Sequence, residues 1–208
     1  MELREKSRGG RPRGFDRDRA VATAMRLFWR HGYEGVSIAD LTAAIGVAAP
    51  SLYAAFGSKA GLYQEALALY EASQGASDPS CLETAPSLAA GVRQFLETAI
   101  AAVTRPDRER GCMISSGVIA CHADHAALAA IMTGRRNAIR EALARRLRRW
   151  LDEKEAAALA RHLAAVMQGI SIQARDGASP QELQEIIGPV VAGLPRRQSP
   201  SEARSKSS

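Results

Sequence analysis

The stretch VSIADLTAAIGVAAPSLYAAFGSK, residues 36–59, predicts two short helices joined by a four-residue turn. Ser37 and Asp40 have the spacing of a capping box, in which each side chain bonds the other residue's backbone at the start of a helix. Gly46 is placed to end that helix, and Pro50 suits the first position of the next one because its missing N–H is not needed there. This order is the pattern of a helix-turn-helix, whose second helix enters the major groove of DNA.

Apolar residues recur at helical spacing on both sides of this unit, and alternating strand patterns are nearly absent. The predicted fold class is therefore all-α. A break rich in small residues and proline lies at 74–86. The other helices are expected at about 17–31, 58–73, 87–104, 111–122, 124–150, 153–175 and 180–194.

Composition narrows the class of protein. The 208 residues are 46% hydrophobic and 24% charged, which is typical of a folded soluble chain. No apolar stretch approaches the roughly 18 residues of a membrane span, so no membrane partner is expected. The charged N-terminus lacks the apolar segment of a secretory signal, and three cysteines are too few for a disulfide framework. We therefore expect a cytoplasmic protein.

The charge distribution bears on the partner. Residues 1–31 carry nine Lys or Arg against four Asp or Glu, whereas residues 32–80 carry one basic residue against five acidic ones. A basic segment at the front favours a polyanion such as nucleic acid, although many basic proteins bind none.

The segment VSIADLTAAIGVAAPSLYAAFGSKAGLYQEAL, residues 36–67, closely resembles the signature of the TetR family of bacterial transcriptional regulators. The matching positions in family order are Ser37, Ile38, Leu41, Gly46, Val47, Leu52, Tyr53, Phe56, Ser58 and Lys59. The basic stretch GRPRGFDRDRA at 10–20, with Phe28, Gly32 and Tyr33, also looks like the family, so that the match covers roughly residues 15–70.

The resemblance implies a two-part organisation. An N-terminal three-helix DNA-binding domain is expected at 15–57, and a C-terminal helical domain for ligand binding and dimerisation at 58–194. A disordered basic arm at 1–14 and a disordered tail at 195–208 would flank them. The implied function is a ligand-responsive regulator, expected to act as a repressor, that binds a palindromic double-stranded operator as a homodimer and is released by a small organic effector.

Several residues are candidates for DNA contact. Tyr53 could lay its ring on the sugar-phosphate backbone and donate its hydroxyl to a phosphate, or be a half-buried core aromatic. Ser37 lies at a helix N-terminus that can bind an anion, or it only caps the helix. Lys59 is in a first turn where its charge opposes the helix dipole, which favours a phosphate contact. The candidates are Ser37, Ala49, Pro50, Ser51, Tyr53, Lys59, Arg11 and Arg13.

The arm and the second helix of the unit predict different kinds of contact. Arg11 and Arg13 could enter a minor groove, attract phosphates without specificity, or belong to an inert tail. The second helix offers Ser51 and several methyl groups but no Arg, Asn or Gln, so direct readout would depend on Ser51 and thymine methyls. Sequence specificity would then depend more on DNA shape and on contacts made by the arm.

The last two helices carry apolar stripes that resemble the family's dimer interface, although they could also close a monomeric core. The stripe residues are Leu163, Val166, Met167, Ile170, Leu183, Ile186, Ile187 and Val190. Under this hypothesis Ile187→Asp yields monomers.

The effector pocket is predicted only from residue type. Candidate lining residues, each of which could equally be core packing, are Tyr63, Phe95, Met113, Ile114, Met132, Met167 and Gln168. They favour an apolar organic effector held by one or two hydrogen bonds.

Alternative functions follow from other residues. Cys121 and His125 lie one helical turn apart and suggest metal sensing, while Cys112 or Cys121 could sense oxidants. A non-specific DNA-coating protein also fits the basic arm. An enzyme is not expected, because the histidines form no partnered triad and no Gly-rich phosphate loop is present; no cofactor is implied.

Overall fold

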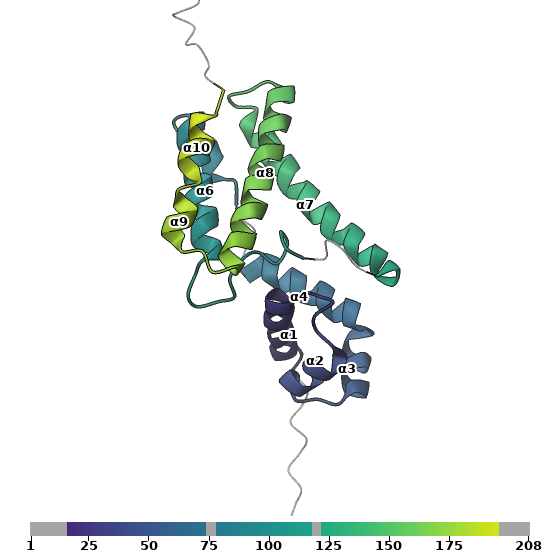
Figure 1. Cartoon of the computed structure of the whole chain (residues 1–208). Coiled ribbons are helices and arrows are strands. Elements are labelled where there is room, and N and C mark those ends of the chain that lie inside the picture. The colour runs from purple at the N-terminus through teal and green to yellow at the C-terminus, as the bar shows by residue number, and fades with distance from the viewer. Residues whose placement is uncertain (1–15, 74–77, 118–121, 196–208) are drawn as a thin grey trace, which may run out of the picture.

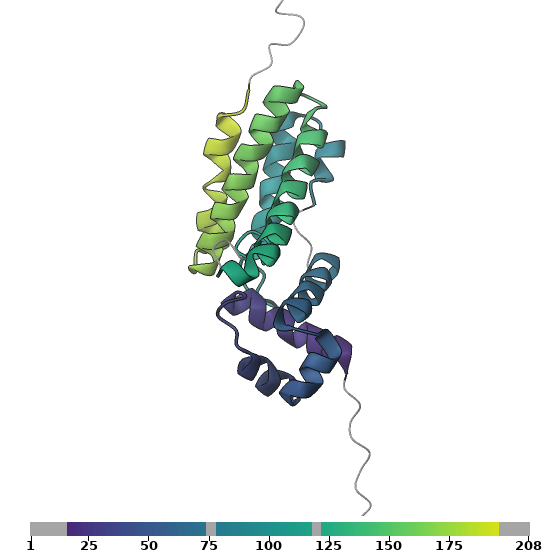
Figure 2. The ribbon, with the colours of Figure 1, turned by 90° about the vertical axis from the view of Figure 1, so that its right-hand side faces the viewer.

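The computed structural model describes residues 16–73, 78–117 and 122–195, and within these ranges the chain is all-helical. The basic arm with Arg11 and Arg13, and almost all of the tail, lie outside the described residues. Figures 1 and 2 show two parts, one above the other, with α4 between them. We call α1, α2 and α3 the head, and the bundle of α6 to α10 the body. The head helices and α4 are Arg17–His31, Ile38–Ile45, Ala49–Phe56 and Lys59–Ser73.

Local signals set the ends of the head helices. The Asp16 carboxylate accepts the Arg19 amide at the start of α1, and the predicted capping box of Ser37 and Asp40 is present at the start of α2. Gly46 ends α2 with φ of +80°, a left-handed conformation that glycine adopts without strain. Pro50 is the second residue of α3 rather than the first, because α3 begins at Ala49.

Aromatic side chains hold α1 on α4. The Phe28 ring lies 5.0 Å from the Tyr63 ring, edge to face, and Tyr33 lies 5.2 Å from Tyr63. Trp29 meets Tyr70 in the same manner at 4.8 Å. All five rings are buried, so α1 and α4 share one continuous core.

The body is a bundle in which α7 packs along α8, and α6 packs against α8, α9 and α10. Its helices are α6 Leu88–Val103, α7 Ala126–Leu147, α8 Glu153–Arg175, α9 Pro180–Gln184 and α10 Ile187–Ala192. The short elements α5 Cys81–Thr84 and η1 Ala123–His125 precede α6 and α7. The short α5 falls inside the predicted break. The single helix predicted at 180–194 is instead two, because Pro189 has no N–H to bond the carbonyl four residues earlier.

The helix predicted at 111–122 is wrong for its described part, 111–117, which forms turns. Gly111 has φ of +80°, and its carbonyl accepts the Trp29 indole N–H at 3.1 Å. The Cys112 amide donates to the Ser171 hydroxyl at 2.8 Å. Side chains from α1 and α8 therefore bind backbone groups at the point where a helix would begin.

Among the described residues, no single helix is both long and apolar enough to cross a membrane; the bent pair of α2 and α3 meets that test by length and composition alone.

Candidate nucleic-acid interface and effector region

The helices α2 and α3 have the relative orientation of a helix-turn-helix. They are bent by 96° about the turn at residues 46–48, within the range of about 90–120° for this motif. Leu41 of α2 and Leu52 of α3 are fully buried and fix the pair against the rest of the head.

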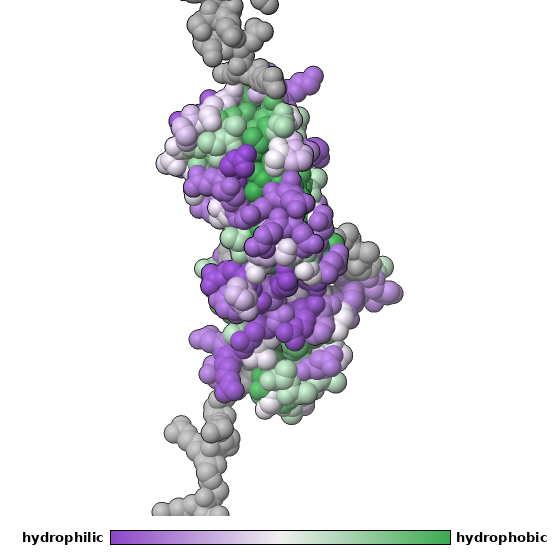
Figure 3. Space-filling model, turned by 60° about the vertical axis from the view of Figure 1, so that its left-hand side comes forward, coloured by the Kyte–Doolittle hydropathy of each residue, from purple (hydrophilic) through white to green (hydrophobic). Residues whose placement is uncertain are grey.

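The outer face of α3 is exposed and mostly apolar. Pro50, Ser51 and Ala54 are exposed, Ala49 is half-buried, and Tyr53 is 46% exposed. The lower end of the molecule, where α2 and α3 lie, is pale green in Figure 3. These side chains are accessible to a partner, and their contact with DNA stays a prediction.

Ser37 has its polar groups occupied by the capping box. Its amide donates to the Asp40 carboxylate at 2.8 Å and its hydroxyl donates to the same oxygen at 2.6 Å. These hydrogen bonds hold the pKa of the Asp40 carboxyl below its ordinary value. The carboxylate thus takes the Ser37 groups that a phosphate would use, and the capping role of Ser37 is confirmed.

Lys59 has a structural contact as well as a candidate role at DNA. Its ammonium nitrogen lies 4.2 Å from the centre of the Tyr33 ring, a cation–π contact. Burial lowers the pKa of this ammonium, while Glu34 and Asp40 act in the opposite direction. The proximity of Tyr33 explains a cation in the first turn of α4 without DNA, so the phosphate contact stays a prediction.

Arg17 is a positioning residue that the sequence analysis missed. Its guanidinium donates to the Ala55 carbonyl near the end of α3 at 2.6 Å and to Glu65 of α4 at 2.5 Å. It also lies 4.6 Å from the centre of the Phe56 ring. The sequence did contain a signal for this contact. Arg17 is a cation in the first turn of α1, where its charge opposes the helix dipole, and such a residue is explained by a partner elsewhere.

The candidate effector residues divide into two groups. Tyr63, Phe95, Met113, Ile114 and Met132 are fully buried side chains of the core. Burial raises the pKa of Tyr63 to about 12, and its hydroxyl lies 3.9 Å from the Met132 sulfur. Met167 and Gln168 line a hollow of about 20 Å³ between α7 and α8. Its other lining residues are Ser115, Arg136, Ile139 and Ala164.

The metal and redox alternatives depend partly on Cys121, which lies outside the described residues. His125 lies edge to face against Tyr33 at 4.9 Å, and its Nε2 is 3.8 Å from the Glu34 carboxylate. Among the described residues, no group of three or more His, Cys, Asp or Glu side chains is arranged to hold a metal ion.

The predicted dimer stripe is partly used within one protomer. Leu163, Ile170, Leu183 and Ile187 are buried in the body's own core. The other four stripe residues, Val166, Met167, Ile186 and Val190, are half-buried. Beside them, a groove of about 510 Å³ between α8 and α10 is lined by Leu159, Val190, Leu194 and neighbouring residues.

Comparisons with known proteins agree on one family. Residues 20–66 match the family described as bacterial regulatory proteins, tetR family. The chain is 35% identical over 197 residues to the HTH-type transcriptional repressor ComR of Escherichia coli (strain K12), covering 88% of this chain and 90% of ComR. It is 31% identical over 183 residues to the repressor BdcR of the same strain, covering 84% and 86%.

A solved structure is similar over nearly the same length. It is a cysteine mutant of the TetR family transcriptional regulator CifR, complexed with 26 bp double-strand operator DNA. The identity is 35% and the TM-score is 0.80, over 89% of this chain and 100% of the CifR chain.

Proposed function

This chain belongs to the TetR family of bacterial regulatory proteins, and from that premise we propose that it represses transcription by binding a palindromic operator as a homodimer. Two relatives are named transcriptional repressors, and the related CifR was solved with operator DNA. In this proposal a small apolar effector releases the DNA, the protein acts in the cytoplasm, and it is not an enzyme.

The observation that carries the proposal is the helix-turn-helix with an exposed second helix. The 96° bend and the buried residues Leu41 and Leu52 present the outer face of α3 as one surface. In this arrangement Tyr53 contacts a phosphate group. Ser51 contacts base edges, together with the methyl groups of the alanines and the methylene groups of Pro50. Arg11 and Arg13 would add phosphate or minor-groove contacts from the arm.

Competition binding tests DNA recognition. We expect the protein to prefer the duplex upstream of its own gene over a random duplex by about 1,000-fold or more, as specific regulators do. Tyr53→Ala should weaken binding to both duplexes by a similar factor, because a contact to phosphate does not depend on the base sequence. Equal affinity of the unaltered protein for the two duplexes would instead identify a non-specific DNA-coating protein.

A row of accessible residues on α8, three of them small, supports the homodimer. Ala158, His162, Ala165, Gly169 and Ile172 recur every three or four positions and are exposed or half-buried. Ile172 is 42% exposed, so this face includes a large apolar side chain that a partner can reach. Figure 3 shows a green, apolar strip on the upper half of the molecule, where the body lies. The face and the groove beside Val190 together offer a surface for a second copy.

Gly169 gives a direct test of this face. A Cβ atom at Gly169 would meet nothing within 4 Å in the protomer, and the same holds for Gly134 of α7. Leucine should therefore fit at either position and raise helix stability by about 0.5–1 kcal/mol. We expect Gly169→Leu to weaken dimerisation by about tenfold or more and Gly134→Leu to leave it unchanged. Sedimentation equilibrium measures this, and an unaltered Gly169→Leu dimer would place the interface elsewhere.

The effector would enter near the hollow between α7 and α8. A volume of about 20 Å³ is far below the roughly 300 Å³ of a ligand pocket, so binding requires the region to open. Met167 lines the hollow, Met113 and Met132 are buried in the core, and methionine side chains repack with little cost. This supports a largely apolar effector, with Gln168 or Ser115 as hydrogen-bonding partners.

A further inference from the structure

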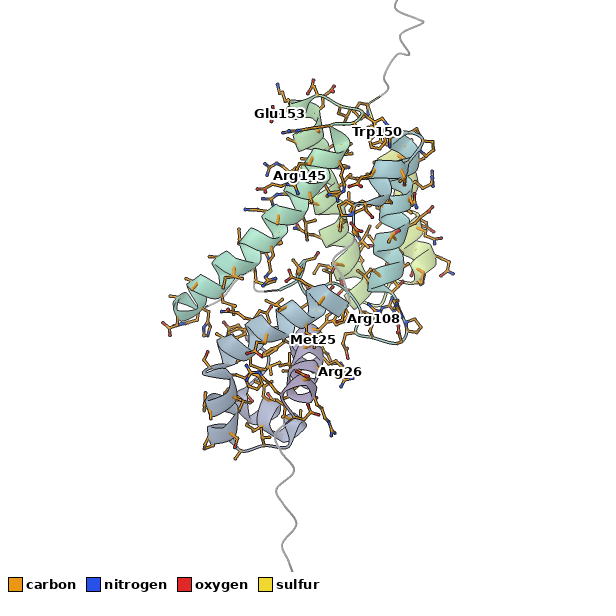
Figure 4. All side chains as sticks on the ribbon, turned by 180° about the vertical axis from the view of Figure 1, so that it is seen from behind. Met25, Arg26, Arg108, Arg145, Trp150 and Glu153 are labelled. Atoms are coloured by element: carbon orange, nitrogen blue, oxygen red, sulfur yellow. The ribbon has the colours of Figure 1, made fainter. Side chains whose placement is uncertain are left out.

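The carboxyl end of α1 is bound to the body by side chains. Figure 4 shows Met25 and Arg26 of α1 beside Arg108 of the segment that follows α6, at the junction of the head and the body. Next to this point Arg30 makes two hydrogen bonds to the Glu109 carboxylate, at 2.8 and 2.9 Å. The Arg30 side chain is 63% exposed, and an ion pair this exposed adds little rigidity.

Arg175, the last residue of α8, makes a stronger connection. Its guanidinium donates to the carbonyl of Trp29 and to the carbonyl of Arg30, each at 2.7 Å. These carbonyls belong to the last turn of α1, where helix carbonyls lack partners within the helix. A cation there also complements the helix dipole. One side chain of the body therefore caps the end of a head helix.

The Arg175 side chain is itself fixed by its surroundings. Its Cγ packs against Gly111, where a Cβ atom would lie only 2.5 Å away. One turn earlier on α8, the buried Ser171 accepts the Cys112 amide. A third contact, at 3.3 Å, joins the guanidinium to the Ser116 hydroxyl. The end of α8, the segment 111–116 and the end of α1 are thus packed as one unit.

We propose that Arg175 is a positioning residue for operator binding: it sets the orientation of the head relative to the helix that carries the dimer face. α8 bears Gly169 and Ile172, while α1 packs on α2 of the helix-turn-helix. In a two-fold dimer, the head orientation on α8 fixes the distance between the two α3 helices and hence the half-site spacing. This inference rests on the proposed function.

The test compares Arg175→Met with Arg110→Met. Methionine keeps the apolar stem of Arg175 but removes its donors. Arg110 is the matched control because it also donates to a backbone carbonyl, that of Ala178, yet this bond lies within the body and does not reach α1. Binding is measured on an operator selected from random duplexes by the unaltered protein, on the same operator with one base pair inserted between half-sites, and on a single half-site.

We expect the unaltered protein and Arg110→Met to prefer the native spacing by about tenfold or more, and Arg175→Met to lose that preference to within about twofold. Affinity for the single half-site, and the dimer seen by sedimentation, should not change in Arg175→Met. A folded Arg175→Met dimer that keeps the spacing preference overturns the inference alone. An equal loss of affinity for all three duplexes also overturns it, since this result would indicate a folding defect. If the unaltered protein selects no paired half-sites, the proposed homodimeric function fails first.

Discussion

Replacing Phe28 with alanine will lower the free energy of unfolding by about 3–5 kcal/mol, the range for deleting a buried aromatic ring. Phe28 is 2% exposed. It packs edge to face on Tyr63 of α4 and stacks near Tyr33 at 6.1 Å. The cavity would open where α1, α4 and the loop after α1 meet, so the head would lose its shared core. For a chain of this size we expect the midpoint of thermal unfolding to fall by about 10 °C.

Tyr53→Ala is the matched control for this prediction. It also deletes an aromatic ring from the head, but from a side chain that is 46% exposed, and should cost less than about 1 kcal/mol. Both variants are measured by thermal and chemical denaturation at one protein concentration, because the proposed dimerisation would make the midpoint depend on concentration. Equal stability of Phe28→Ala and Tyr53→Ala would contradict the aromatic core between α1 and α4.

Ile187→Asp should unfold the body rather than separate two folded subunits. Ile187 is 2% exposed and belongs to the core of its own protomer. An unpaired carboxylate there would cost about 3–5 kcal/mol or would bind a proton instead. The same substitution at Val190, one turn along α10, places the charge on a half-buried side chain of the groove beside α8. Val190→Asp should therefore give folded monomers.

Circular dichroism and sedimentation separate these two results. Ile187→Asp should show a lowered unfolding midpoint at every protein concentration, whereas Val190→Asp should keep its helical signal and sediment as a monomer. A folded, monomeric Ile187→Asp would return Ile187 to the subunit interface, where the sequence pattern placed it.

Local signals in the sequence predict most of the fold. The capping box of Ser37 and Asp40, the turn at Gly46 and the spacing of apolar residues predict the head helices within one or two positions. These signals are strong because caps and turns depend on residues three or four positions apart. The TetR resemblance, which depends on the same local segment, predicted the family correctly.

Long-range contacts limit what the sequence can predict. The prediction of a helix after Gly111 is wrong because it considers only neighbouring residues. The groups that bind this backbone, on Trp29 and Ser171, lie 82 and 59 residues away in sequence. Arg175 binds carbonyls of residues that are 146 and 145 positions away in sequence, and no local sequence pattern around Arg175 predicts these contacts. The stripe containing Ile187 was found, but apolar periodicity does not distinguish a face buried by the same protomer from one buried by a second copy.

The alanine-rich outer face of α3 makes this helix easy to retarget. Ala54 is exposed, and the neighbouring Ala55 contacts Arg17 only through its backbone carbonyl, which accepts a hydrogen bond from the guanidinium. A longer polar side chain at Ala54 would displace nothing in the core and would not weaken the helix much, since alanine and most long side chains differ little in helix propensity. If α3 reads base edges, as proposed above, new base preferences would be acquired one substitution at a time. A duplicated copy of this gene could diverge in its set of operators while its head stays folded.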